Sequence, residues 1–176
     1  MAVSQAKILV VDDTDVNIKL LRALLKGAGH AVVTAANGTE GLTAATTENP
    51  DLILLDIMMP DLTGFEVCQR LRATVETSHI PIVFLTALHE MEDHAKAMEV
   101  GGDDILTKPI NKLELLTRVR SLLRLSLQSR QLREQRQLIH DLLRAYVSED
   151  AAQRYLADPD SVHALDRLAP PSGKDA

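Results

Sequence analysis

Five polar side chains follow short apolar runs of the sequence, and their types suit cation binding and phosphate chemistry. Asp12 and Asp13 follow KILVV, Asp56 ends DLILLD, Thr86 follows PIVFL, and Lys108 follows DILT. An ionised carboxylate directly after a buried strand is costly unless a cation pairs with it or a reaction uses it. An aspartate that merely caps the next loop is a common alternative for one residue, but it does not explain five such positions.

The chemistry expected of this set is transfer of a phosphoryl group to Asp56. Three carboxylates in one place repel one another, which raises their pKa values unless a cation is present. Mg²⁺ binds carboxylates together with water and phosphate oxygens, and aspartate carboxylates form aspartyl phosphates. Because phosphoryl transfer needs mainly positioning and charge neutralisation, Lys108 would supply positive charge and Thr86 a hydroxyl for the product phosphate.

Alternating strands and helices must hold these residues together. Apolar runs predict strands over residues 7–11, 30–35, 52–55, 80–85 and 104–106, and helical spacing predicts helices over 15–27, 38–48, 64–73, 89–100 and from 111 onward. Five alternations in about 120 residues indicate an α/β fold with a doubly wound parallel sheet. Right-handed crossovers with one reversal of strand order predict the flavodoxin-like order 2-1-3-4-5.

This strand order predicts where the five residues lie. The first and third strands flank the point of reversal, so Asp12, Asp13 and Asp56 should meet in one crevice at the carboxyl edge of the sheet. Thr86 and Lys108 should lie on the same rim. Near it, Asp15 is placed to cap the first helix.

Composition limits the class of protein. A chain of 176 residues has room for one domain and an appendage. A single cysteine, Cys68, excludes an intrachain disulfide and is interpreted as a small packing residue. No apolar stretch approaches the ~20 residues of a membrane span, and the N-terminus lacks a signal-peptide pattern. We therefore expect a cytoplasmic protein without a membrane partner.

The spaced motifs around these residues resemble the receiver domain of bacterial two-component response regulators. The resemblance rests on the acidic pair Asp12-Asp13, the segment DIMMPDLTG, Thr86-Ala87 and Lys108-Pro109, and it extends from residue 6 to about residue 124. It implies that Asp56 accepts a phosphoryl group from a phosphohistidine on a sensor histidine kinase or a phosphotransfer protein.

The resemblance also implies roles for individual residues. Mg²⁺ would be bound by Asp13, Asp56 and the backbone carbonyl of Met58, with Asp12 helping through water. Thr86 would move toward the phosphate, and the bond between Lys108 and its following proline would be cis. One departure is Ile105, which stands where the family usually has a Tyr or Phe that rotates during signalling. We therefore expect phosphorylation without an aromatic switch.

The charge and the helical pattern change after the receiver-like part. Residues 1–111 hold 8 Lys/Arg and 16 Asp/Glu, whereas residues 112–147 hold 8 and 3. No Pro or Gly interrupts residues 111–147, which predicts one long helix. A 3-4-3-4 spacing along it forms a heptad seam, made of Leu122, Leu125, Ser129, Leu132, Arg136, Ile139, Leu143 and Tyr146. The seam predicts a parallel homodimer through residues 112–147; a helix that folds back on its own domain is the alternative.

The last part of the sequence suggests how the chain divides. Residues 146–169 resemble the linker that precedes class III nucleotide cyclase domains, although no cyclase follows within this sequence. We predict a receiver domain over 1–124, a coiled-coil extension over 125–147, a short helical linker over 148–169 and a disordered tail over 170–176.

The sequence therefore predicts a response regulator without catalytic output of its own, which relays phosphorylation of Asp56 through a dimeric helical extension. The first alternative is the regulatory part of a receiver-controlled nucleotide cyclase. The second is a DNA-binding regulator, which the sequence disfavours. No helix-turn-helix pattern supports DNA binding. With no Trp, two Phe and two Tyr, the sequence also offers no aromatic platform on which bases could stack.

Overall fold

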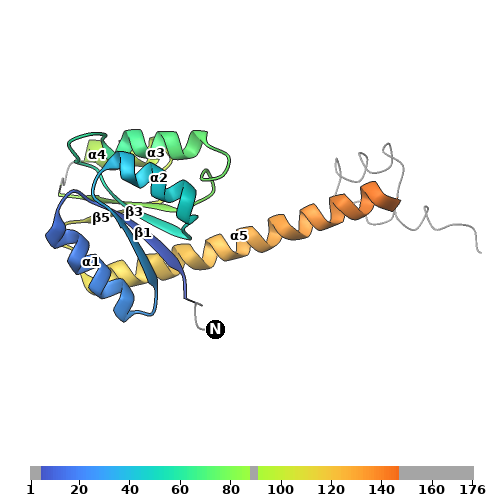
Figure 1. The fold of residues 1–176 in the computed structure, drawn as a ribbon, viewed down its shortest axis with the longest axis horizontal. Coiled ribbons are helices and arrows are strands. Elements are labelled where there is room, and N and C mark those ends of the chain that lie inside the picture. The colour runs from blue at the N-terminus through green and yellow to red at the C-terminus, as the bar shows by residue number, and fades with distance from the viewer. Residues whose placement is uncertain (1–4, 88–90, 147–176) are drawn as a thin grey trace, which may run out of the picture. The chain divides into compact units, whose positions relative to one another are not determined.

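The computed structural model describes residues 5–87 and 91–146, in which strands and helices alternate (Figure 1). The strands are β1 (Lys7–Val11), β2 (Ala31–Ala35), β3 (Leu52–Asp56), β4 (Ile82–Thr86) and β5 (Asp104–Thr107). The helices are α1 (Asp15–Gly27), α2 (Gly38–Glu48), α3 (Gly64–Ala73), α4 (Met91–Glu99) and α5 (Lys112–Tyr146). All neighbouring strands pair in parallel in the order β2-β1-β3-β4-β5, so the predicted flavodoxin-like fold is confirmed.

The central strands are apolar on both faces because helices cover both sides of the sheet. Along β1, Ile8 and Val10 belong to one core cluster, whereas Leu9 and Val11 belong to the other. The cluster that contains Leu9 is completed by α2, α3 and α4, and the opposite cluster by α1 and the first turns of α5 (Figure 1). Cys68 lies in the α2–α4 cluster, where burial raises the pKa of its thiol to about 11, in agreement with a packing role.

The start of α1 differs from the prediction that Asp15 caps it. Asp15 is the first residue of the helix, and the N-cap is Thr14, whose side chain makes no capping hydrogen bond. The backbone N–H of Thr14 instead donates to Asp12 Oδ1 at 2.8 Å. The prediction was wrong because Asp12 already supplies the acceptor at this helix end, while Asp15 adds a negative charge that the helix dipole favours.

Other boundaries move by one or two residues. Strand β2 begins at Ala31 rather than His30, and β4 begins after Pro81 because Ile80 donates its N–H to Thr77 O within a turn. The connection between α4 and β5 contains Gly101 at a φ of 99°, a left-handed conformation that favours glycine.

The long helix predicted from residue 111 onward is confirmed as α5, which runs for 35 residues from Lys112 to Tyr146. The chain separates into two compact units, Met1–Leu127 and Gln128–Ala176, and α5 contributes residues to both. The predicted linker over 148–169 and tail over 170–176 lie outside the described residues. Among the helices that the structure describes, none is long and apolar enough to cross a membrane.

Candidate functional site: three aspartates and a lysine at the carboxyl edge of the sheet

The ends of β1 and β3 bring three aspartates together, as the strand order predicted. Asp12 and Asp13 follow β1, Asp56 is the last residue of β3, and the two strands are neighbours in the sheet. Each aspartate offers a carboxylate oxygen, and these oxygens lie within 4.8 Å of one another. Asp12 is fully buried and Asp56 is 5% exposed, whereas Asp13 is open to solvent.

These three aspartates fit a hard divalent cation. Their ligand atoms are all carboxylate oxygens, which is the donor type that Mg²⁺ prefers. The exposed Asp13 leaves one side of the group accessible to water and to an incoming phosphate, and a bound Mg²⁺ keeps several such oxygen ligands. The two buried carboxylates would repel each other strongly without a positive charge nearby.

Lys108 provides that charge from the end of β5. Its Nζ lies 2.9 Å from Asp12 Oδ2 and 3.1 Å from Asp56 Oδ1, so one ammonium pairs with both buried carboxylates. The backbone N–H of Lys108 donates to Thr86 O at 2.7 Å, which ties the end of β5 to the end of β4. The peptide bond between Lys108 and Pro109 is cis, as expected from the sequence.

Burial and charge act in opposite directions on the pKa values of this pair. Burial raises the pKa of Asp56 above its usual value, and the nearby Lys108 ammonium offsets only part of that rise. Burial by itself would lower the pKa of Lys108, but the hydrogen bond to Asp12 and the charge of Asp56 outweigh it, so that the pKa is raised. Lys108 is therefore positively charged at neutral pH.

Asn17 also belongs to this site, and sequence reasoning missed it. Its Nδ2 lies 3.2 Å from Asp12 Oδ1 and 3.1 Å from Asp12 Oδ2, and it donates toward both oxygens. The signal was present in the sequence, because Asn17 stands in the first turn of the helix that directly follows the acidic pair. Such a side chain can reach back over the N-terminus of its helix.

Of the remaining predicted residues, Thr86 and Met58 lie at or just beyond the same edge of the sheet, whereas Ile105 lies inside β5. Thr86 is the last residue of β4 and is 2% exposed; it lies one position beyond Leu85, which pairs with Asp56. Met58 lies two residues after Asp56 and has an exposed side chain, and the role of its carbonyl stays a prediction. Ile105 is buried within β5 and packs in the α2–α4 cluster.

The loop after Asp56 is held in place by two features that position Asp56 indirectly. Gly64 donates its N–H to Ile57 O at 2.8 Å, and a Cβ at Gly64 would collide with the backbone oxygen of Asp56. Asp61 accepts hydrogen bonds from the N–H groups of Gly38 and Thr39 at the start of α2, at 2.9 and 2.8 Å. These bonds hold the pKa of Asp61 well below its usual value.

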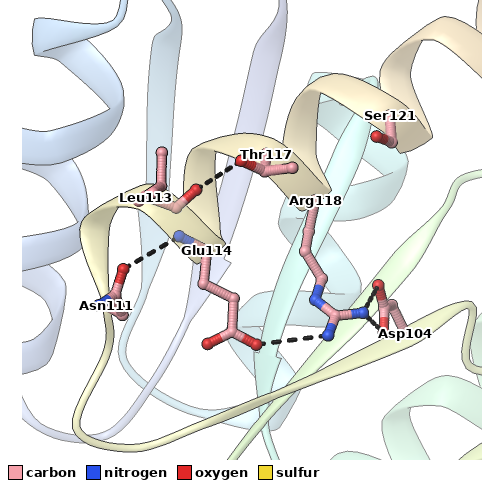
Figure 2. A pocket seen from close by; sticks show the side chains of 7 residues that line it. All are labelled: Asp104, Asn111, Leu113, Glu114, Thr117, Arg118 and Ser121. Atoms are coloured by element: carbon pink, nitrogen blue, oxygen red, sulfur yellow. Dashed lines mark hydrogen bonds and ion pairs between the residues drawn. The ribbon is translucent and has the colours of Figure 1, made fainter.

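A groove of about 580 Å³ is formed where β5 meets α5, and Asp12, Asp13 and Asp56 do not line it. In Figure 2, Arg118 extends from α5 toward β5, and its Nη1 lies 2.7 Å from both carboxylate oxygens of Asp104. Its Nη2 also pairs with Glu114 at 3.3 Å. None of the five residues predicted to do chemistry lines this groove.

Comparisons with known proteins agree with this geometry. A family model described as the response regulator receiver domain matches residues 8–120. Response regulator PleD of Caulobacter vibrioides is 46% identical over 129 residues, which cover 73% of this chain and 28% of PleD. The alkaline phosphatase synthesis transcriptional regulatory protein PhoP of Bacillus subtilis is 46% identical over 120 residues, covering 68% of this chain and 49% of PhoP. This chain thus spans less than half the length of either relative.

A solved structure shares the fold. The receiver domain of a sensor histidine kinase from Pseudomonas aeruginosa PAO1, solved with a magnesium ion coordinated in its active site cleft, matches at a TM-score of 0.64 and 29% identity. The match covers 68% of this chain and 98% of that structure. With the family model covering residues 8–120 and the sheet order in agreement, the chain belongs to the response regulator receiver domain family.

Proposed function

We propose that this chain is a phospho-acceptor signalling module in which Asp56 receives a phosphoryl group from a sensor histidine kinase or a phosphotransfer protein. The observation that carries the proposal is the position of the Lys108 ammonium, 3.1 Å from Asp56 and 2.9 Å from Asp12. A nearly buried carboxylate beside a shared ammonium and two further carboxylates suits phosphoryl transfer, which depends on positioning and charge neutralisation.

In the proposed reaction, an oxygen of Asp56 attacks phosphorus as the phosphorus–nitrogen bond of the phosphohistidine breaks. The bonding electron pair leaves with the imidazole nitrogen, which takes up a proton. Lys108 and the hydroxyl of Thr86 then bind oxygens of the new aspartyl phosphate. Asp13, Asp56 and the backbone carbonyl of Met58, with Asp12 through water, would hold Mg²⁺, which supplies charge neutralisation at the phosphoryl oxygens when bound.

The proposed output is a change in a homodimer formed through α5, and on this proposal the residues of this sequence supply no catalytic output. Leu125, Leu132 and Ile139 of the heptad seam are between 40% and 59% exposed, although they are large and apolar. Exposed apolar side chains at heptad spacing are typical of a helix that packs against a second helix. Polar Ser129 and Arg136 within the seam would weaken the coil and help to set its register.

The alternative is the regulatory part of a receiver-controlled nucleotide cyclase. It rests on the resemblance of residues 146–169 to the linker that precedes class III cyclase domains. The reading frame beyond Ala176 decides between the two proposals: a cyclase domain with its metal-binding aspartates would favour the alternative. Nucleic acid is not an expected partner, and gel retardation of duplex DNA at physiological salt would contradict this.

A small acyl phosphate tests phosphoryl acceptance without knowledge of the kinase. With this donor and Mg²⁺, we expect the intact mass to rise by one phosphoryl group, and we expect hydroxylamine to remove it, because acyl phosphates react with this nucleophile. Asp51→Asn is the matched control. Asp51 directly precedes β3, at the end of the strand opposite to Asp56, and accepts a hydrogen bond from Lys7 N. No uptake by the wild type, or equal uptake by Asp56→Asn, would refute the proposal.

A further inference from the structure

We propose that Asn17 is a positioning residue that holds Asp12 ready for the divalent cation and remains bound to Asp12 when Lys108 turns toward the phosphoryl group. That Asn17 holds Asp12 follows from the geometry of Asp12 alone. That Asn17 remains when Lys108 moves rests on the proposed function. The family resemblance gave Asn17 no role. The amide group is the one neutral side-chain donor that the described residues direct toward Asp12.

Asp12 needs these donors because it is completely buried. A carboxylate without contact with water is costly unless its oxygens accept hydrogen bonds. Oδ1 accepts from Thr14 N at 2.8 Å and from Asn17, while Oδ2 accepts from Lys108 at 2.9 Å and from Asn17. Asn17 is therefore the group that spans both oxygens and fixes the plane of the carboxylate.

The two donors to Oδ2 differ in what else they must do. Lys108 also pairs with Asp56, the proposed phosphoryl acceptor, and its charge is needed there when the phosphoryl group arrives. Each movement of Lys108 toward that group removes a donor from Asp12 Oδ2. Asn17 remains, since among the described residues its amide nitrogen donates to Asp12 alone. Asp12 thus keeps a donor on each oxygen in both states.

An amide suits this position better than a charged or apolar side chain. Asn17 donates without bringing a positive charge that would repel a divalent cation, and without adding a fourth carboxylate. It stands in the first turn of α1, half-buried, and its short side chain points back to Asp12, three residues before the helix begins. A leucine of similar size would fill the same space, and each oxygen of Asp12 would lose one of its two donors.

Metal binding tests the proposal independently of phosphorylation. We expect Asn17→Leu to weaken Mg²⁺ binding by about tenfold or more, measured by calorimetry without a phosphodonor, because the loss of a hydrogen-bonding group outside the direct ligands of a metal typically costs 10- to 100-fold in affinity. Lys19→Ala, on an exposed position of the same helix, is the control and should bind Mg²⁺ like the wild type. Urea unfolding in EDTA measures any separate loss of stability.

A purely structural role would give a different result. If Asn17→Leu is less stable but binds Mg²⁺ with unchanged or higher affinity, the proposal is refuted. Should the leucine variant fail to fold, Asn17→Ser decides, because serine is tolerated in a half-exposed helix turn and is too short to span both oxygens of Asp12. A wild type that binds Mg²⁺ but accepts no phosphoryl group would refute the proposed function, while the calorimetric comparison would still decide the role of Asn17.

Discussion

At the scale of single residues, the main feature of the site is that, among the described residues, one ammonium pairs with two buried carboxylates. Asp12 and Asp56 are both buried, and Lys108 is the ammonium that the described residues place between them. The raised pKa of Asp56 has burial as its main cause, so this carboxylate is held in a less favourable ionised state than an exposed aspartate. A carboxylate of this kind gains more from a cation than a solvated one would.

Asp61 shows the opposite behaviour and predicts a pH dependence of stability. Its pKa is depressed in the folded state by the N–H groups of Gly38 and Thr39, so its contribution is fully present above the pKa of the unfolded chain. That contribution is lost as the pH falls toward the depressed value. We therefore expect Asp61→Ala to lower the melting temperature at pH 7. The difference in melting temperature between the variant and the wild type should shrink as the pH falls below about 4.

Thermal unfolding followed by circular dichroism between pH 3 and pH 7 measures this convergence. Glu76→Ala is the control, since Glu76 is an exposed acid outside the loop that contacts α2. A difference between Asp61→Ala and the wild type that stays constant over this range would show that the carboxylate charge does not matter.

At the scale of the elements, the sequence predicted the strands and helices well where burial alone decides. The run LILL became β3 because every side chain in it packs against one of two helical layers. The prediction failed at the start of α1, where one local contact takes the place of another: Asp12, rather than Asp15, accepts the hydrogen bond, and its donor is Thr14 N two residues later. Asn17 was missed although its partner Asp12 lies only five residues before it, whereas Asp61 was missed because its partners Gly38 and Thr39 come from another segment of the chain.

Tight packing between α4 and the sheet gives a prediction at this scale. A Cβ at Gly102 would lie 2.6 Å from Phe84 Cε2 and 2.8 Å from Ala97 O, which is closer than real contacts allow. We expect Gly102→Ala to lower the free energy of unfolding by about 1–3 kcal/mol, the usual cost of overpacking. Chemical denaturation followed by circular dichroism measures it.

Gly27 offers a matched control for this substitution. It is the last residue of α1, and a Cβ there would meet nothing within 4 Å. Gly27→Ala should therefore be neutral or stabilising by up to about 1 kcal/mol, because alanine favours helix. Equal effects of the two substitutions would show that the contact with Phe84 is not what excludes a side chain at Gly102.

At the scale of the whole molecule, the proposed phosphorylation of Asp56 would have to be transmitted to α5. Residue 105 is an isoleucine buried in β5. Because its side chain is aliphatic, no rotating aromatic ring is available at that position. Arg118 binds Asp104 through two hydrogen bonds of 2.7 Å, which join the strand that precedes Lys108 to the helix that bears the heptad seam (Figure 2). This contact is a direct link between the site strand and α5.

The predicted dimer is testable with two leucines that differ in helical position. Leu132 lies on the heptad seam and Leu138 does not, although both are exposed, at 51% and 60%. We expect light scattering to give the mass of a dimer for the wild type and for Leu138→Asn, and a shift toward monomer for Leu132→Asn. A monomeric wild type both with and without phosphodonor, or equal effects of the two substitutions, would refute a coil through this seam.

We predict that Asp56 itself carries the phosphoryl group. The most direct measurement is to treat the protein with a small acyl phosphate donor and Mg²⁺, and then to reduce the aspartyl phosphate formed on the protein with borohydride. Peptide mass spectrometry then locates the reduced residue. We predict a reduced residue at position 56, and none when Mg²⁺ is removed with EDTA or when Asp56→Asn is used. Reduction at Asp12 or Asp13 instead, or at no aspartate in this cluster, would contradict the account.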